Sequence, residues 1–129
     1  MLIDVFGGDE QFGPGSREAV RRCRAEGSLI ACDVVWAEVV GGFASQTAAE
    51  GALERLGIGC SPTGASGAAI AGGAWAEYRR RGGSRERLIP DFLVGAHALN
   101  QAEGLLTRDR GFYRQCFCEL RLVDPTADR

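Results

Sequence analysis

Apolar residues alternate along the chain between short runs and longer segments with helical spacing. Runs typical of buried strands stand at 2–6, 29–32, 58–60, 105–107 and 120–123. The longer segments predict helices at 17–27, 34–43, 46–56 and 65–81, then one from 90 to a stop at 104, and a short turn near 112. This alternation favours one three-layer α/β domain over 1–129, with a mainly parallel central sheet flanked by helices.

Capping residues mark several predicted helix ends. Ser16 and Asp33 are expected to cap the helices that follow them, because short oxygen side chains accept hydrogen bonds from first-turn amides. Gly27 and Gly57 are expected to end helices, since glycine adopts the left-handed conformation found after many helices. Thr63 is expected to open the longest helix.

Two aspartates stand at opposite ends of the segment IPDFLVGAHALNQAEGLLTRDRGFY, 89–113. Asp91 follows Pro90 in the first turn of the predicted helix, and Asp109 comes just after the strand that follows it. In a parallel α/β sheet a helix starts near the carboxyl edge of the strands, and the next strand returns to that edge. We therefore expect the two carboxylates to face one crevice, as oxygen ligands suited to Mg²⁺ or Mn²⁺.

Glu38 is a third acid of interest. It lies about five residues into a helix that follows a strand, so at about 1.5 Å rise per residue it stands within about 8 Å of the same edge. Three carboxylates in one crevice repel one another unless a divalent cation is present. The alternative is a surface Glu that points to solvent. Asp91 and Asp109 have alternatives too, as a helix-start acid and as a helix cap.

Composition describes an ordinary soluble protein. The chain is 45% hydrophobic and 25% charged, with a net charge of −2. No apolar run approaches the roughly 20 residues that span a bilayer, and the amino terminus does not resemble a secretory signal. We expect a cytoplasmic protein without a membrane contact.

The five cysteines are odd in number and scattered, which favours reduced, mostly buried thiols over disulfides. A zinc site is the alternative, and its ligands would be Cys60, Cys116, Cys118 and His97. The Cys-x-Cys spacing fits such a site poorly. His97 is expected to be a packing or capping residue, because it points away from Asp91 on a helix.

All fifteen basic residues are Arg, which either reflects the composition of the source genome or suits phosphate binding. Five of them crowd a nine-residue stretch that Glu86 alone opposes: Arg79, Arg80, Arg81, Arg85 and Arg87. The stretch predicts a nucleic-acid contact, to which Arg108 is added. A solvated helix end whose cations suit the helix dipole is the alternative.

These residues together resemble the PIN-domain ribonucleases of the VapC toxin type. The segment DFLVGAHALNQAEGLLTRDRGFY is similar to that family's carboxy-terminal signature, with Asp91 and Asp109 as its third and fourth acids and Thr107 at its hydroxyl position. VVWAEVVGGF is similar to the segment with the second acid, which falls on Glu38. The likeness is firm in the last third of the chain and loose over 46–76.

The opening motif departs from the family pattern. LIDVFGGDE is similar to the end of that motif, so Asp4 aligns with its trailing Asp and the leading metal ligand is missing. Asp4 would be a doubtful substitute for this missing ligand, because it lies about one helical turn further along the chain. We expect the natural protein to start further upstream, with Met1 at the family's Val position.

The resemblance implies a Mg²⁺-dependent endoribonuclease toxin, a cognate antitoxin that inserts a segment into the acidic crevice, and a homodimer. Without the leading Asp, the alternative is a catalytically impaired PIN-like module that binds RNA or a partner. A nucleotide-binding Rossmann-like protein is a weaker alternative. The glycines at 7, 8, 13 and 15 do not form Gly-x-Gly-x-x-Gly between a strand and a helix.

Overall fold

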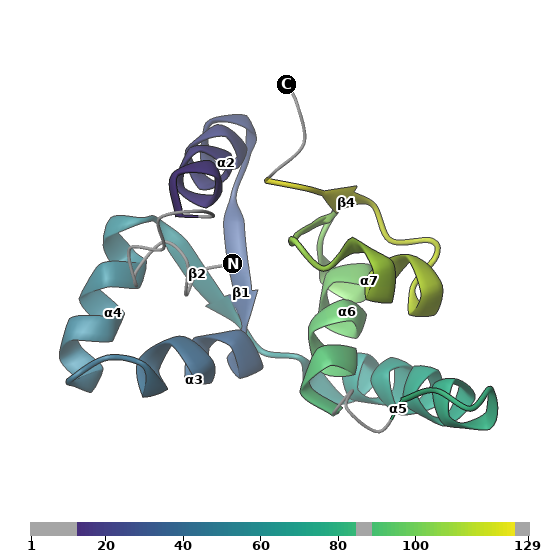
Figure 1. Ribbon diagram of the computed structural model, residues 1–129. Helices are drawn as coiled ribbons and strands as arrows, with labels where there is room; N and C mark the ends of the chain where they lie inside the picture. Colours follow the sequence, from purple (N-terminus) through teal and green to yellow (C-terminus); the bar gives the residue numbers. More distant parts are fainter. Residues whose placement is uncertain (1–12, 85–88, 126–129) are drawn as a thin grey trace. The chain divides into compact units, whose positions relative to one another are not determined.

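The computed structural model describes residues 13–84 and 89–125 (Figure 1). Their order of elements is α2 Gly13–Glu26, β1 Leu29–Cys32, α3 Asp33–Gly41, α4 Gln46–Arg55, β2 Ile58–Ser61, α5 Gly64–Arg80, α6 Ile89–Gln101, β3 Leu105–Leu106, α7 Arg110–Cys116 and β4 Leu122–Val123. The α/β class is confirmed, and each predicted element within the described ranges is present. The strand predicted at 2–6 lies outside the described residues.

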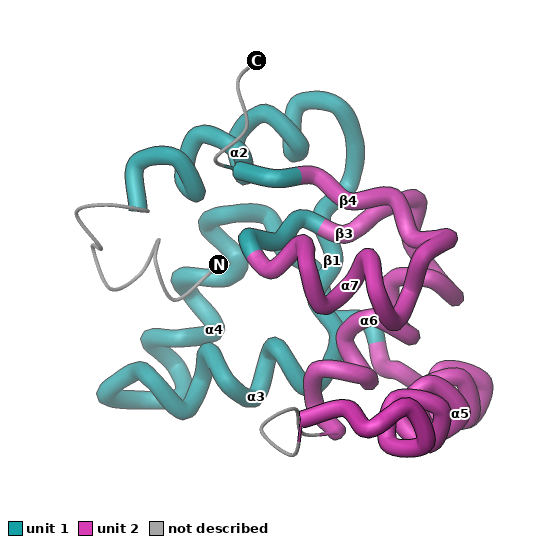
Figure 2. The backbone as a smooth tube through the Cα atoms, turned by 45° about the vertical axis from the view of Figure 1, so that its right-hand side comes forward, with its two compact units in different colours: residues 1–61, 106–108, 124–129 teal, residues 62–105, 109–123 magenta. Residues whose placement is uncertain are grey.

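The chain divides into two compact units, which Figure 2 colours teal and magenta. Unit 1 comprises 1–61, 106–108 and 124–129, and unit 2 comprises 62–105 and 109–123. The expectation of one domain stays a prediction.

Unit 1 contains the parallel pair of strands. β1 pairs with β2 in a register that sets Leu29 opposite Ile58 and Cys32 opposite Ser61. Helices α3 and α4 form the crossover that a parallel pair requires. The buried apolar side chains between these elements are Ala31, Val39, Leu53 and Ile58. The predicted parallel pairing is therefore present, in short strands.

Helix α2 is tied to the end of α4 within unit 1. The Arg24 guanidinium donates a hydrogen bond of 2.9 Å from Nη1 to the Leu56 carbonyl, which lies at the C-cap of α4. Gly57 follows with φ of 70°, so it ends α4 as predicted. The predicted cap at Ser16 was wrong, because α2 begins at Gly13 and Ser16 is a buried residue inside it. Pro14 suits the first turn of such a helix.

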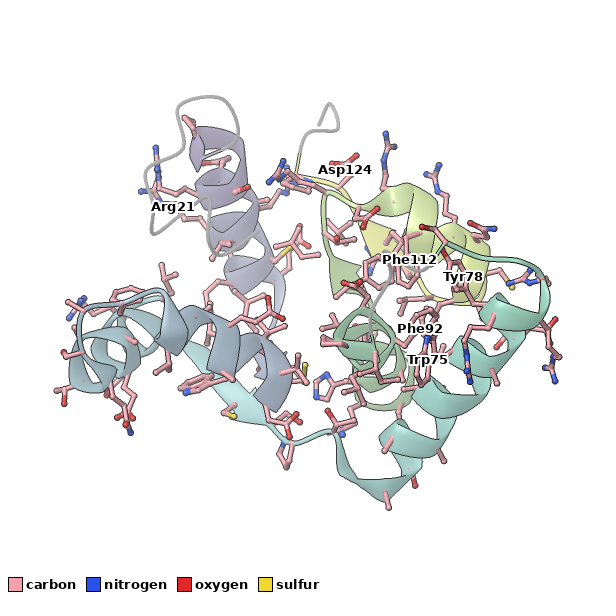
Figure 3. The ribbon with its side chains drawn as sticks, turned by 60° about the horizontal axis from the view of Figure 1, so that its bottom comes forward. Arg21, Trp75, Tyr78, Phe92, Phe112 and Asp124 are labelled. Carbon is pink, nitrogen blue, oxygen red and sulfur yellow. The ribbon has the colours of Figure 1, made fainter. Side chains whose placement is uncertain are left out.

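Unit 2 is built around aromatic rings. Tyr78 of α5, Phe92 of α6 and Phe112 of α7 pack edge to face, with Phe92 5.5 Å from Tyr78 and 5.1 Å from Phe112 between ring centroids (Figure 3). Tyr113 and Phe117 extend the cluster. Such pairs contribute about 0.5–1.5 kcal/mol each beyond the area that they bury.

Two hydrogen bonds link further segments of unit 2. Gln101, the last residue of α6, donates a hydrogen bond of 2.8 Å to the Pro62 carbonyl before α5. Leu105 of β3 donates a backbone hydrogen bond of 2.9 Å to the Arg121 carbonyl beside β4. His97 is 4% exposed in α6, which agrees with a packing role.

Candidate functional site

Asp91 lies in the first turn of α6, as the sequence predicts. Its neighbour Phe92 is fully buried in the aromatic cluster, whereas Asp91 is half-buried. The ring of Phe92 therefore fixes the rotation of the helix at the point where the carboxylate leaves it. An acid at this position also interacts favourably with the positive end of the helix dipole.

Asp109 stands immediately before α7 and is half-buried. Its backbone has φ of −91° and ψ of 65°, and its side chain makes no capping hydrogen bond to the helix. The Asp109 carboxylate therefore does not cap α7, which was the alternative that the sequence left open. Its position just after β3 agrees with the prediction.

A ring contact relates the two acids within unit 2. Phe92 follows Asp91 by one residue, Phe112 follows Asp109 by three, and these rings lie 5.1 Å apart. The starts of α6 and α7 thus lie at the same end of unit 2.

Glu38 belongs to unit 1. It lies on α3 between the half-buried Trp36 and the buried Val39, and its own side chain is exposed. Thr107 and Arg108 are half-buried and precede Asp109 directly in the chain. The convergence of Glu38 and Thr107 with the two aspartates stays a prediction.

Neither unit contains, among the residues described, a group of three or more His, Cys, Asp or Glu side chains able to hold a metal ion. The zinc alternative therefore gains no support. All five cysteines are free, as predicted, but the expectation of mostly buried thiols was wrong. Cys32 alone is buried, whereas Cys23 and Cys116 are half-buried and Cys60 and Cys118 are exposed. Burial raises the pKa of the Cys32 thiol. Asp4 lies outside the described residues.

The predicted arginine cluster occupies the end of α5. Arg79, Arg80 and Arg81 are exposed there, whereas Arg85 and Arg87 lie outside the described residues. Sequence reasoning missed that Arg79 covers the ring of Trp75, with 4.2 Å from Cζ to the ring centroid. The signal was present in the four-residue spacing of the two side chains, which sets them on one helix face.

No helix within the described ranges is long and apolar enough to cross a membrane.

The α/β fold of this chain is similar to the folds of solved structures. The chain is similar to VapBC-1 from nontypeable Haemophilus influenzae, with a TM-score of 0.71 and 15% identity over 98% of this chain and 93% of that chain. It is also similar to VapBC2 from Rickettsia felis bound to a DNA fragment from their promoter, with a TM-score of 0.65 and 14% identity over 95% and 91%.

No protein-family model matches the chain, and no curated protein matches it. At these identities the structural similarity shows the fold. That fold is similar to the VapC PIN fold of toxin–antitoxin complexes, as the motifs of the sequence predict.

Proposed function

We propose that this chain is a Mg²⁺- or Mn²⁺-dependent endoribonuclease, a PIN-domain toxin that hydrolyses RNA phosphodiester bonds. One observation carries the proposal: Phe92 and Phe112, which follow Asp91 and Asp109 closely in the chain, lie 5.1 Å apart between ring centroids in unit 2. The fold similar to VapC supports it. Two half-buried carboxylates are a donor set that suits a hard divalent cation.

Each residue of the proposed site has a distinct role. Asp91 and Asp109 would hold the ion together with Glu38, and Asp4 is a doubtful fourth ligand. Thr107 would support the site through its hydroxyl group. When bound, the ion would supply Lewis-acid stabilisation and a water of lowered pKa. The arginines of α5, with Arg85, Arg87 and Arg108, would hold the RNA backbone, because guanidinium groups bind phosphate bidentately.

Partners follow from the same proposal. The similar structures are VapBC complexes, which supports a cognate antitoxin that inhibits this chain. We also propose a homodimer and a cytoplasmic location.

The test is RNA cleavage by the purified chain with Mg²⁺ or Mn²⁺. We expect cleavage that EDTA stops and that Asp91→Asn abolishes. Glu103→Gln is the matched control, because it removes one charge from an exposed residue beyond the far end of α6. Equal cleavage in EDTA would show that the metal mechanism is wrong, and equal loss in both variants would show that charge alone matters.

A catalytically impaired PIN-like module that binds RNA or a partner is the second candidate. It is favoured by the lack, within either unit's described residues, of a group of three metal-binding side chains. Thermal melting with Mn²⁺ separates the two candidates, because a ligand at 100 times its Kd stabilises the folded state by about 2.7 kcal/mol. An unchanged melting temperature at millimolar Mn²⁺ would favour the binding module.

A further inference from the structure

The three arginines at the end of α5 have unequal surroundings. Glu77 forms an ion pair with Arg80 and a second one, 3.8 Å from Oε1 to Nε, with Arg81. One carboxylate thus offsets part of the charge of two guanidinium groups. Three cations and one anion leave a net charge of +2 on this helix end, and Arg79 contributes the one positive charge with which Glu77 forms no ion pair.

Arg79 is held by an aromatic ring instead. Its Cζ lies 4.2 Å from the centroid of the Trp75 ring, and Trp75 packs against the core of unit 2. No carboxylate within the described part of the chain pairs with Arg79. Guanidinium groups stack on aromatic faces while their N–H groups remain directed outward in the plane. The Trp75 ring therefore orients the Arg79 cation, which no carboxylate of the described residues neutralises.

The position of this pair relates it to the acids. Tyr78, next to Arg79, lies 5.5 Å from Phe92 and 6.3 Å from Phe112 between ring centroids. Those two rings follow Asp91 and Asp109 closely in the chain. Arg79 and both aspartates are therefore each close in the chain to a ring of one aromatic cluster in unit 2. Figure 3 labels Tyr78, Phe92 and Phe112 of that cluster, and Trp75.

We propose that Arg79, held on Trp75, is the principal phosphate-binding residue of this helix end and binds one phosphodiester of single-stranded RNA. The inference rests on the proposed function and names the residue that makes one contact with the RNA backbone. A fixed guanidinium loses less conformational entropy on binding than a mobile one. An exposed guanidinium plane also accepts a stacked base, which an acidic polypeptide does not offer, so RNA is the favoured partner.

The experiment measures binding of a fluorescein-labelled single-stranded oligoribonucleotide to the full chain by anisotropy, in EDTA, at several salt concentrations. We expect Arg79→Ala to raise Kd about 3- to 10-fold and to reduce the slope of log Kd against log salt by about 0.7, which is one phosphate contact on a single strand. The comparison variants Arg80→Ala and Arg81→Ala should raise Kd less than Arg79→Ala does, since Glu77 offsets part of the charge of both residues.

Two further variants separate the effect of the Arg79 charge from the effect of its fixed position on Trp75. Trp75→Leu retains apolar packing and every charge, so Kd should rise while the salt slope stays unchanged. Arg79→Lys retains the charge without the planar fork, so it should restore the slope but only part of the affinity. Melting curves for each variant check folding.

Equal effects of the three alanine variants, or no effect of Arg79→Ala, would overturn the assignment. If poly-L-glutamate binds with the same dependence on Arg79 and displaces RNA, the site recognises acidic polypeptide and the RNA assignment is wrong. Metal-dependent cleavage by the unmodified chain is measured in parallel. Cleavage that survives Arg79→Ala with unchanged RNA binding refutes the assignment alone, whereas absence of both RNA binding and cleavage refutes the proposed function as well.

Discussion

Gly95, buried in the middle of α6, provides a sharp test of the packing in unit 2. A Cβ atom added there would lie 2.5, 2.7 and 2.9 Å from three ring carbons of Phe117. Carbon atoms attract best at about 3.5–4.0 Å, so the ring would have to move by about 1 Å. Phe117 is 4% exposed and packs against Phe92 and Phe112, which leaves it little room.

The expected magnitude is a balance of two effects. Overpacking a filled core costs about 1–3 kcal/mol. Replacing Gly by Ala in a helix interior returns up to about 1 kcal/mol. Gly95→Ala should therefore lower the free energy of unfolding by about 1 kcal/mol, which for a chain of this length lowers Tm by about 4 °C.

Gly72→Ala is the matched control. Gly72 lies inside α5, and a Cβ atom there would meet nothing within 4 Å. Only the helix preference remains, so this variant should be stabilised by about 0.5–1 kcal/mol. Urea denaturation followed by circular dichroism measures both variants against the unmodified chain.

A double-mutant cycle locates the cause. Phe117→Leu opens space beside Gly95, so Gly95→Ala should cost about 1 kcal/mol less in that background than in the unmodified chain. If Gly95→Ala proves as stable as Gly72→Ala, or if its cost is the same in both backgrounds, the contact with Phe117 does not limit this position.

Two further predictions concern unit 1 and the cysteines. Gly57→Ala should destabilise by about 1–2 kcal/mol, measured in urea, because its φ of 70° is costly for alanine and its Cβ would meet the Arg24 guanidinium. An unchanged midpoint would contradict this. Iodoacetamide with mass spectrometry should modify Cys60 and Cys118 first and Cys32 last, since burial raises the pKa of the Cys32 thiol. The pKa of the Cys32 thiol is raised in the folded state, so the stability that Cys32 contributes is present below the usual thiol pKa of 9.0. This stability is lost as the pH rises above that value. A lower urea midpoint at pH 10 than at pH 8 would detect the loss. Rapid modification of Cys32, or equal midpoints, would refute the reasoning.

Local sequence signals were enough for most helix and strand positions. The strand at 29–32 and the glycine stop at Gly57 are confirmed, because periodicity and left-handed glycine are local properties. Ser16 was mistaken for a cap because a hydroxyl in the first turn of a helix resembles one in sequence. The start of α2 at Gly13 depends on Pro14, a backbone effect, and on the burial of Ser16, a tertiary effect.

The arginine cluster shows where sequence reasoning stops. Charge counting treated Arg79, Arg80 and Arg81 as equivalent, yet Glu77 reaches two of them and Trp75 holds the third. Both contacts follow helical spacing, so the sequence contained the candidates. It could not decide between competing partners, because Glu77 lies within reach of more than one cation and the choice depends on side-chain geometry.

The relation between the two aspartates stays a prediction, and the contact that supports it differs from the one on which the sequence argument depended. The prediction relied on the carboxyl edge of a parallel sheet, whereas within unit 2 the relation is carried by Phe92 and Phe112. Each ring is buried and lies within three residues of an acid, so a shift of either ring would move the helix start that presents the carboxylate. In this unit the packing of the aromatic cluster should therefore determine the geometry of the proposed metal site. A variant that loosens the cluster should lower the stability of the unit and also impair the proposed site.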